Sequence, residues 1–196
     1  MRFPCPIAGP DRADVAHLLG GHTLYPRVGM RELGEPMAED TVTQGLGSLL
    51  ADSTDLYLRY KGYHWNVGGP LFYEFHLLFD EQAKGVFRGL DLLGERLRAR
   101  GKWSPYGMDS LAPLRTIPAE TEPPGTVREM LERLAAIHRR IGENIRRVAG
   151  SAGAEGDIAT ESLLSELLGD HEKMEWFLRE TLSGRAPGLE HKLTRT

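Results

Sequence analysis

Apolar residues recur three or four positions apart in four long stretches of this chain, which is the spacing of an amphipathic helix. The first stretch runs from about residue 38 to 67, the second from 70 to 100, the third from 127 to 149 and the fourth from 157 to 184. No segment alternates apolar and polar residues as a half-buried strand does. The pattern therefore predicts four long helices and no sheet.

Residues that commonly end or start helices separate the first two stretches. Gly68 and Gly69 interrupt the apolar spacing, and Pro70 is predicted to be the first residue of the second helix, where a proline costs no hydrogen bond. Gly101 is a candidate end for this helix because glycine readily adopts the left-handed conformation of a C′ residue. The five prolines of residues 101–125 predict a long connection with a short helix around 108–114.

The last two helices also carry capping signals. Thr126-x-x-Glu129 has the form of a capping box. Residues 150–156 are predicted to form a loop, with Asp157 as the N-cap of the fourth helix. Four long helices with a long second-to-third connection predict an all-α, four-helix bundle over residues 37–184.

Two segments flank the predicted bundle. Residues 1–36 are rich in proline and glycine, which predicts an irregular N-terminal extension that is dispensable for assembly. Residues 185–196 are predicted to form a short C-terminal tail.

Composition narrows the class of protein only slightly. A length of 196 residues with 40% hydrophobic and 27% charged residues is typical of one soluble domain, and the net charge of −4 does not favour polyanion binding by the whole molecule. The single cysteine, Cys5, excludes an internal disulfide framework. No apolar run is long enough for a membrane span, and we read no secretory signal, so a cytoplasmic location is expected.

Five residues carry the candidate chemistry: His64, His76, Asp80, Asp91 and Glu95. Imidazoles together with several carboxylates form a site for iron, manganese or zinc. Residues four apart share one face of a helix, so His76 lies beside Asp80 and Asp91 lies beside Glu95. Taken singly, each has an ordinary alternative, as a surface carboxylate or a packed histidine.

The spacing between the two pairs has a geometric consequence. From Asp80 to Asp91 an unbroken helix rises roughly 16 Å at about 1.5 Å per residue, which one metal centre cannot span. If all five residues bind one cluster, the two pairs must come from different copies of this helix. The ligand residues also lie roughly 120° away from the core stripe of Phe72, Phe79, Val86, Leu90 and Leu97 at about 100° per residue, so they are expected to face a two-fold partner, with Ala83 and Phe87 packed near the axis.

A metal site inside one bundle would be expected to show Glu-x-x-His on two helices. The residues three before the four histidines His64, His76, His138 and His171 are Lys61, Tyr73, Ala135 and Leu168. None of these is acidic, so the usual site inside the bundle is not expected.

The segment YKGYHWNVGGPLFYEFHLLFDEQ, followed by D-x-x-x-E-R at Asp91, resembles the signature of the Dps family, small ferritin-like proteins named for DNA protection in starved bacteria. The resemblance covers about residues 40–182, and HEKMEWFLRE resembles the end of the family's fourth helix. It implies a hollow homo-dodecamer that oxidises ferrous iron with hydrogen peroxide or oxygen and stores ferric mineral. It also implies two irons per intersubunit site, bound by His64, His76 and Asp80 of one subunit and by Asp91 and Glu95 of its mate.

The resemblance suggests roles for three further residues, each with an alternative. Trp65 would border the iron site and trap oxidising equivalents, or it would only pack at an interface. Asp157 and Glu161 would line a pore through which iron enters, or they would stabilise a helix N-terminus. His171 is expected to be structural or interfacial.

DNA compaction is the alternative function, because some members of the family bind DNA through lysine-rich tails. Here residues 1–36 carry four arginines against four acids, a net charge of zero, and residues 183–196 carry a net charge of +2. Twelve weakly basic tails could still act together through avidity.

Overall fold

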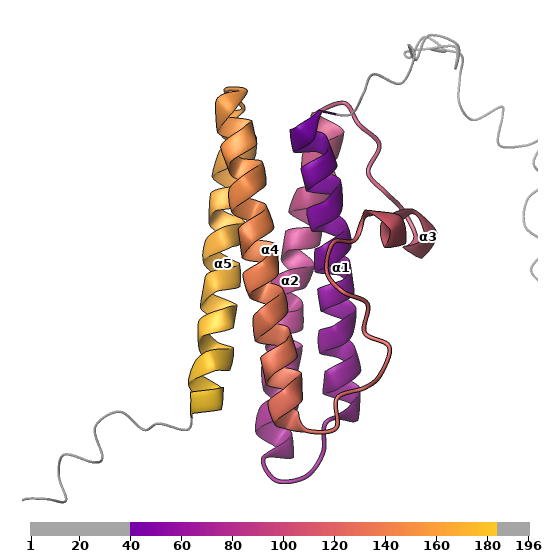
Figure 1. Ribbon diagram of the computed structural model, residues 1–196, viewed down its shortest axis with the longest axis vertical. Coiled ribbons are helices and arrows are strands. Elements are labelled where there is room, and N and C mark those ends of the chain that lie inside the picture. Colours follow the sequence, from indigo (N-terminus) through magenta and orange to yellow (C-terminus); the bar gives the residue numbers. More distant parts are fainter. Residues whose placement is uncertain (1–39, 184–196) are drawn as a thin grey trace, which may run out of the picture. The chain divides into compact units, whose positions relative to one another are not determined.

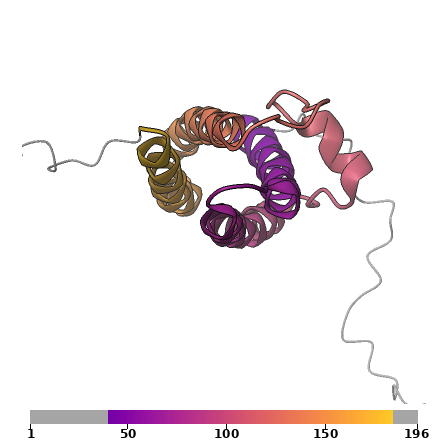
Figure 2. The same ribbon diagram turned by 90° about the horizontal axis from the view of Figure 1, so that it is seen from below.

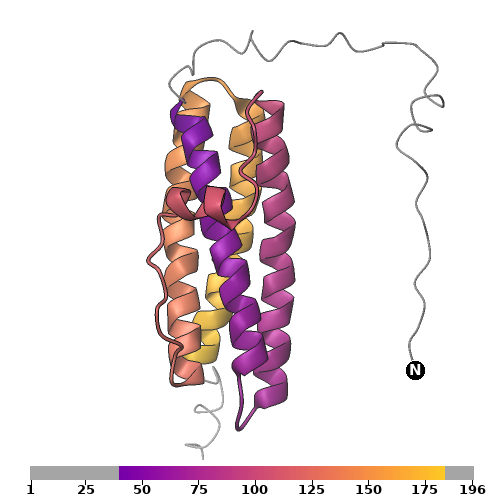
Figure 3. The ribbon, with the colours of Figure 1, turned by 90° about the vertical axis from the view of Figure 1, so that its right-hand side faces the viewer.

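The computed structural model describes residues 40–183, and the predicted N-terminal extension and C-terminal tail lie outside this range. Four long helices lie side by side, as Figure 1 and Figure 3 show. Their bounds, with those of two short elements in the second-to-third connection, are α1 Thr41–Asn66, α2 Phe72–Ala99, α3 Met108–Leu111, the 3₁₀ helix η2 Ala112–Leu114, α4 Val127–Ala154 and α5 Ile158–Ser183. The predicted four-helix bundle is confirmed, and so is the short helix near residues 108–114.

Helices α1 and α2 form one antiparallel hairpin, and α4 and α5 form a second. Seen along the bundle in Figure 2, the four helices surround a common core, and α3 lies outside it beside α1. Fully buried side chains from all four helices fill this core, among them Leu46, Phe79, Ile141 and Leu164. Each such side chain contributes about 1.5–3 kcal/mol when it leaves water.

The long connection is attached to the bundle by a buried carboxylate. Asp52 of α1 is completely buried and accepts hydrogen bonds from the Thr116 backbone nitrogen at 2.6 Å, the Thr116 hydroxyl at 2.6 Å and the Ile117 nitrogen at 3.1 Å. These bonds satisfy a charge that would otherwise be costly to bury. They explain how a proline-rich segment follows a defined path along the bundle.

Several predicted boundaries are confirmed by the backbone. Thr126 and Glu129 form the capping box of α4. Asp157 caps α5, since its carboxylate accepts from the Thr160 nitrogen at 3.0 Å. Gly101 follows the C-cap of α2 with a φ of 79°, in the left-handed region that glycine tolerates best.

Two predicted boundaries are wrong. Helix α2 begins at Phe72 and not at Pro70, because Leu71 takes a left-handed φ of 62° that no helical residue has. The predicted loop at 150–156 is largely helical: α4 continues to Ala154, and the chain turns within three residues because Gly156 adopts a φ of 74°. The glycines at 150 and 153 lower helix propensity, but packing of α4 against α5 outweighs that cost.

None of the helices within residues 40–183 is long and apolar enough to cross a membrane.

Candidate metal centre

His64 and His76 lie face to face across the hairpin of α1 and α2. His64 is in the last turn of α1 and His76 in the second turn of α2, and the five-residue turn between the helices brings them together. Their rings are stacked with centroids 3.7 Å apart at an angle of 23°. Each ring is bonded through Nδ1 to the backbone carbonyl of the other residue, at 2.8 Å for His64 and 2.9 Å for His76.

These two hydrogen bonds determine which ring nitrogens are protonated. A carbonyl oxygen can only accept, so each Nδ1 must carry the hydrogen and donate it. In the neutral imidazole the Nε2 atom then keeps its lone pair. A backbone carbonyl on the second nitrogen is the usual outer support of a metal-binding histidine. The pair therefore presents two unprotonated Nε2 atoms, both on half-buried side chains.

Asp80 lies one helical turn after His76 and is held by two lysines. Lys61 Nζ lies 2.7 Å from Asp80 Oδ1, and Lys84 Nζ lies 2.6 Å from Oδ2. The hydrogen bond from Lys61 and then that from Lys84 hold the pKa of the Asp80 carboxyl well below its usual range. Asp80 is thus ionised and carries cationic partners where a metal ion would bind. The spacing of four residues places Lys84 beside Asp80, but nothing in the spacing indicates Lys61, which comes from α1.

Asp91 and Glu95 lie farther along the same helix and are both exposed. Neither carboxylate has a hydrogen bond or an ion pair with another residue of the described chain. Helix α2 is continuous from Phe72 to Ala99, so the assumption of an unbroken helix between Asp80 and Asp91 is confirmed. In residues 40–183 of one chain, no three His, Cys, Asp or Glu side chains come together as a metal site. One chain brings His64 and His76 together, holds Asp80 one turn farther along α2 against two lysines, and leaves Asp91 and Glu95 apart.

Exposed apolar side chains lie near the candidate ligand residues. Trp65 is 69% exposed, Phe87 57% and Phe72 45%. Two sequence expectations for this surface are wrong: Phe72 does not belong to the core, and Ala83, expected near a two-fold axis, is buried within its own bundle. Ala83 points inward because it lies on the same side of α2 as Phe79 and Val86, which pack in the core.

The Asp157 carboxylate already has hydrogen-bond and ion-pair partners within its own chain. Its carboxylate caps α5 and forms ion pairs with Arg96, at 2.6 Å, and with Arg100. Burial raises its pKa, but bonds from Thr160, Arg96 and Arg100 outweigh that effect and hold the pKa well below the usual range. The capping alternative is therefore confirmed for Asp157. A pore role stays a prediction, and it now depends on Glu161, whose side chain is exposed.

A second polar group, which spacing alone did not single out, crosses the bundle core. It contains one residue from each long helix: Tyr60 of α1, Gln82 of α2, His138 of α4 and His171 of α5, all buried. The Tyr60 hydroxyl lies 2.6 Å from His138 Nε2 and donates to Gln82 Oε1, while the His138 and His171 Nδ1 atoms lie 2.9 Å apart. Gln82 Nε2 donates to the Met174 carbonyl at 3.4 Å. A structural role for His171 is confirmed, and each member could have been suspected as a polar residue within an apolar helical stripe.

Comparisons of the sequence and of the structure with known proteins point to the same family. The sequence matches the ferritin-like domain family over residues 43–185. It is 29% identical to DNA protection during starvation protein 1 of Deinococcus radiodurans over 87% of this chain and 81% of that protein, and 32% identical to a nutrient stress-induced DNA-binding protein of a Nostoc species over 72% and 77%. The structure resembles Dps from Thermosynechococcus elongatus with a TM-score of 0.71 and 34% identity, over 76% of this chain and 93% of that one.

Proposed function

Because this chain belongs to the Dps family of ferritin-like proteins, we propose that it oxidises ferrous iron with hydrogen peroxide, or with oxygen, and stores the ferric product. Iron storage and protection are the general functions of this family. The observation that carries the finer proposal is the His64–His76 pair, whose Nδ1 bonds leave a lone pair on each neutral Nε2, with Asp80 one helical turn after His76 on α2. Imidazole and carboxylate donors together suit ferrous iron, which is here the substrate.

The remaining ligands come from a second copy of the chain. Asp91 and Glu95 are exposed and without partners in the described residues, and they cannot reach His76 along one helix. An antiparallel two-fold partner would place its own Asp91 and Glu95 beside His76 and Asp80 of the first chain, and the symmetry would create two equivalent sites. Burial of Trp65, Phe72 and Phe87 would favour this contact.

We propose that these dimers assemble into a hollow homo-dodecamer around stored mineral. Sedimentation of the protein in neutral buffer should then give about twelve times the chain mass of 21.8 kDa. A protein that sediments only as a monomer would contradict both the shell and the shared site.

The proposed reaction moves two electrons in one encounter. Two ferrous ions each give one electron to one hydrogen peroxide molecule, which takes up two protons and leaves as two waters, so no hydroxyl radical is released. His64 and His76 hold and orient the metal through Nε2, while Asp80, Asp91 and Glu95 offset the increased positive charge of the ferric product. These carboxylates can also accept protons as the product hydrolyses.

Stoichiometry and a matched pair of variants test this proposal. Ferrous oxidation under anaerobic conditions should consume one peroxide for two irons, and spin trapping should detect little hydroxyl radical. Asp91→Asn should lose most of this activity, whereas Asp109→Asn, an exposed carboxylate on α3, should retain it. Equal activity in the two variants would contradict the assigned site.

Trp65 is proposed to donate an electron when oxidising equivalents escape the iron pair. It directly follows His64 and its ring is accessible. Trp65→Phe should keep the assembly and abolish an indole radical signal after peroxide addition. If the radical persists, the packing alternative applies to Trp65.

Glu161 is proposed to attract ferrous iron toward the interior, because acids repeated around a symmetry axis create a focused negative potential. Glu161→Gln should slow iron uptake at low ferrous concentration and low ionic strength without changing the assembly. Glu166→Gln on the same helix is the control, since its side chain is also exposed. Equal slowing in both variants would show a general charge effect and not a pore.

DNA binding is the second candidate function, and it is favoured by the names of the relatives from Deinococcus and Nostoc. The exposed arginines of α4 support it weakly, because Arg139 pairs with Glu175 and Arg146 with Glu172. A mobility shift should be strong at low salt and fall steeply as salt rises if phosphate contacts dominate. No shift at physiological salt would exclude this candidate.

A further inference from the structure

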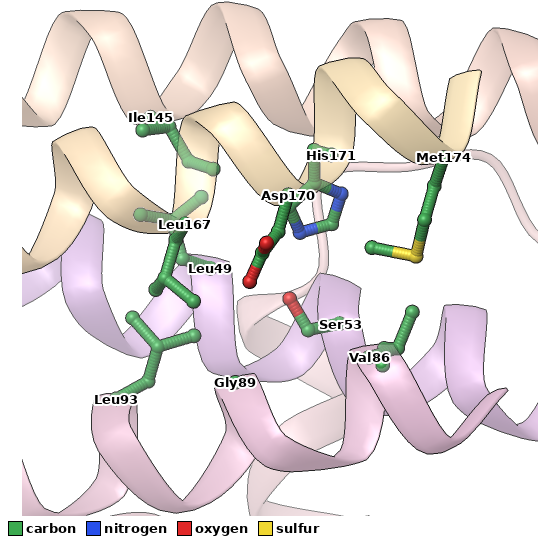
Figure 4. Close-up of a pocket in the computed structure, with 11 residues that line it drawn as sticks. Leu49, Ser53, Val86, Gly89, Leu93, Ile145, Leu167, Asp170, His171 and Met174 are labelled. Atoms are coloured by element: carbon green, nitrogen blue, oxygen red, sulfur yellow. The ribbon is translucent and has the colours of Figure 1, made fainter. Parts of the chain in front are cut away.

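A small cavity lies in the bundle core beside His171. It has a volume of about 10 Å³ and is bordered by residues from all four long helices. Figure 4 shows His171 and Met174 pointing from α5 into this space, with Ser53 of α1 and Gly89 of α2 on the opposite side. This volume admits one atom-sized occupant, a single water or a single ion.

The hydrogen bonds of the core determine which ring nitrogen of His171 carries the hydrogen. Gln82 donates through Nε2 to the Met174 carbonyl, so its Oε1 faces Tyr60 and the Tyr60 hydroxyl must donate to it. The Tyr60 oxygen then accepts from His138 Nε2–H. Neutral His138 is left with a lone pair on Nδ1, and this accepts from His171 Nδ1–H.

His171 Nε2 consequently keeps an unprotonated lone pair. His171 is only 6% exposed, and no residue of the described chain bonds its Nε2 atom. His171 lines the cavity, so this unpaired ring nitrogen is a donor available to an occupant of the cavity. Burial also lowers the pKa of His171 to about 4, which keeps the ring neutral at physiological pH.

Met174 places a second electron-pair donor at the same cavity. It follows His171 by three residues, so both side chains lie on one face of α5. A Cβ atom built at Gly85 would lie 3.3 Å from Met174 Sδ, so the glycine leaves the space in which the thioether sits. Most of the other lining side chains are aliphatic, while Ser53 adds a hydroxyl and Asp170 a carboxylate.

From this geometry we propose that His171 Nε2 and Met174 Sδ bind one cuprous ion in the core of each bundle. A thioether selects a soft metal such as Cu(I), and imidazole also binds copper. Zinc requires four ligands, and hard divalent ions keep several waters, but a cavity of about 10 Å³ has no room for those additional ligands. A soft ion of low coordination number matches the imidazole and thioether donors in this small space, and the Asp170 carboxylate on its border would offset the charge of the ion.

A path from solvent to this site lies between α2 and α5. A groove of about 230 Å³ shares Gly85, Asp170 and Met174 with the cavity. Asp170 has no ion pair within the described residues, and together with Glu81 it balances the positive charges of Arg88 and Lys173, which line the same groove.

Anaerobic titration with Cu(I) against a coloured cuprous chelator tests the site in the full-length, assembled protein. The reference protein carries Cys5→Ser, His64→Ala and His76→Ala, which removes the thiol and the proposed iron-binding imidazoles. We expect it to retain one cuprous ion per chain. X-ray absorption of the bound copper should show both sulfur and nitrogen neighbours.

Two variants and one control identify the ligands. Met174→Leu preserves the apolar volume, and His171→Asn preserves a donor toward His138 but deletes Nε2. Each should weaken Cu(I) affinity by at least about tenfold, since even outer-shell changes at metal sites cost about 10- to 100-fold. Met108→Leu, at an exposed methionine of α3, should change nothing. If His171→Asn does not assemble, Met174→Leu alone decides the question.

Three results would overturn the proposal. One is loss of all copper from the reference protein to the chelator. Another is unchanged affinity in Met174→Leu. The third is a crystal structure of the copper-treated protein in which the cavity holds a water only. None of these results depends on ferrous oxidation, so the site is tested separately from the proposed iron chemistry.

Discussion

At the scale of single residues, the spacing of His76 and Asp80 predicted that they share a helix face, but not how their atoms are held. The reciprocal Nδ1 bonds of His64 and His76 depend on the turn that joins α1 and α2, which helical periodicity does not describe. Lys61 on Asp80 could not be predicted, because it lies on a different helix, whereas Lys84 stands four residues after Asp80 and was overlooked. Residue types thus predicted the candidate ligands, whereas their protonation and their partners required the tertiary structure.

Lys61 is predicted to compete with metal for Asp80. Its side chain is only 19% exposed and its ammonium nitrogen lies 2.7 Å from the carboxylate, so a metal ion that uses Asp80 must displace it. Lys61→Met should therefore tighten Co²⁺ or Fe²⁺ binding several-fold, measured by competition titration. Lys84→Met is the control, because that lysine is 70% exposed and such pairs contribute only about 0.3–0.5 kcal/mol. Weaker binding in Lys61→Met would show that the lysine assists metal binding instead.

The buried histidines are predicted to make stability fall in mild acid. Burial lowers the pKa of His171 to about 4 and lowers that of His138 as well, whereas unfolded histidines titrate near 6.5. Between these values the unfolded chain binds more protons, so the free energy of unfolding should fall by about 1.4 kcal/mol per pH unit for each histidine. The contribution of these two histidines to the free energy of unfolding should be constant above about pH 7.

Urea unfolding between pH 7 and pH 5 measures this dependence. His171→Asn should show a shallower pH dependence than the original chain, because one of the two titrating rings is gone. Equal unfolding midpoints at pH 7 and pH 5 in the original chain would contradict the prediction.

At the scale of elements, apolar periodicity predicted all four long helices because each buries a continuous stripe against its neighbours. The errors lie where local signals and packing disagree. Pro70 is a good first residue of a helix, yet the left-handed Leu71 delays α2 by two residues. The glycine-rich end of α4 looked like a loop, but its contact with α5 keeps it helical to Ala154. Boundaries set by tertiary contacts are not encoded in a single-helix pattern.

The ion pairs of Asp157 are predicted to stabilise the end of the bundle at which α2 and α5 meet. Asp157 links the start of α5 to Arg96 of α2 and to Arg100, the C-cap residue of α2, and its side chain is 13% exposed. Asn caps a helix as well as Asp does, so Asp157→Asn isolates the loss of the ion pairs. It should reduce the free energy of unfolding by about 1–3 kcal/mol, between the values for surface and buried pairs.

Chemical denaturation provides the measurement, and Glu155→Gln is the matched control. Glu155 also pairs with Arg100 but is 40% exposed, so its loss should have little effect. Equal stabilities for the two variants would mean that burial of Asp157 does not strengthen its ion pairs.

At the scale of the whole molecule, a single bundle leaves the candidate centre incomplete and its surroundings apolar. The described chain holds no complete metal cluster, and Trp65, Phe72 and Phe87 remain exposed near the candidate ligand residues. The sequence predicted this outward flank through the rise of α2 between Asp80 and Asp91. Which chain supplies each ligand is not visible in one copy, so that division stays a prediction.

Mixed assemblies test the division directly. One variant carries His76→Ala and Asp80→Ala, and a second carries Asp91→Ala and Glu95→Ala. Each alone should lose most ferrous oxidation, because every site lacks part of its ligand set. At a two-fold interface between the two variants, one site lacks all four residues and the other has all of them. Random mixing makes about half of the interfaces mixed, so about a quarter of the sites should recover.

Activity after verified co-assembly therefore distinguishes two arrangements of the same residues. If the centre lies between subunits, mixed shells should reach about a quarter of the original activity, well above either parent. If each centre lay within one chain, every chain in the mixture would still carry a damaged site, and mixing would restore nothing. That second result would mean that helix α2 does not separate Asp80 from Asp91 in the active protein, since only a break in this helix would let one chain supply all five ligands.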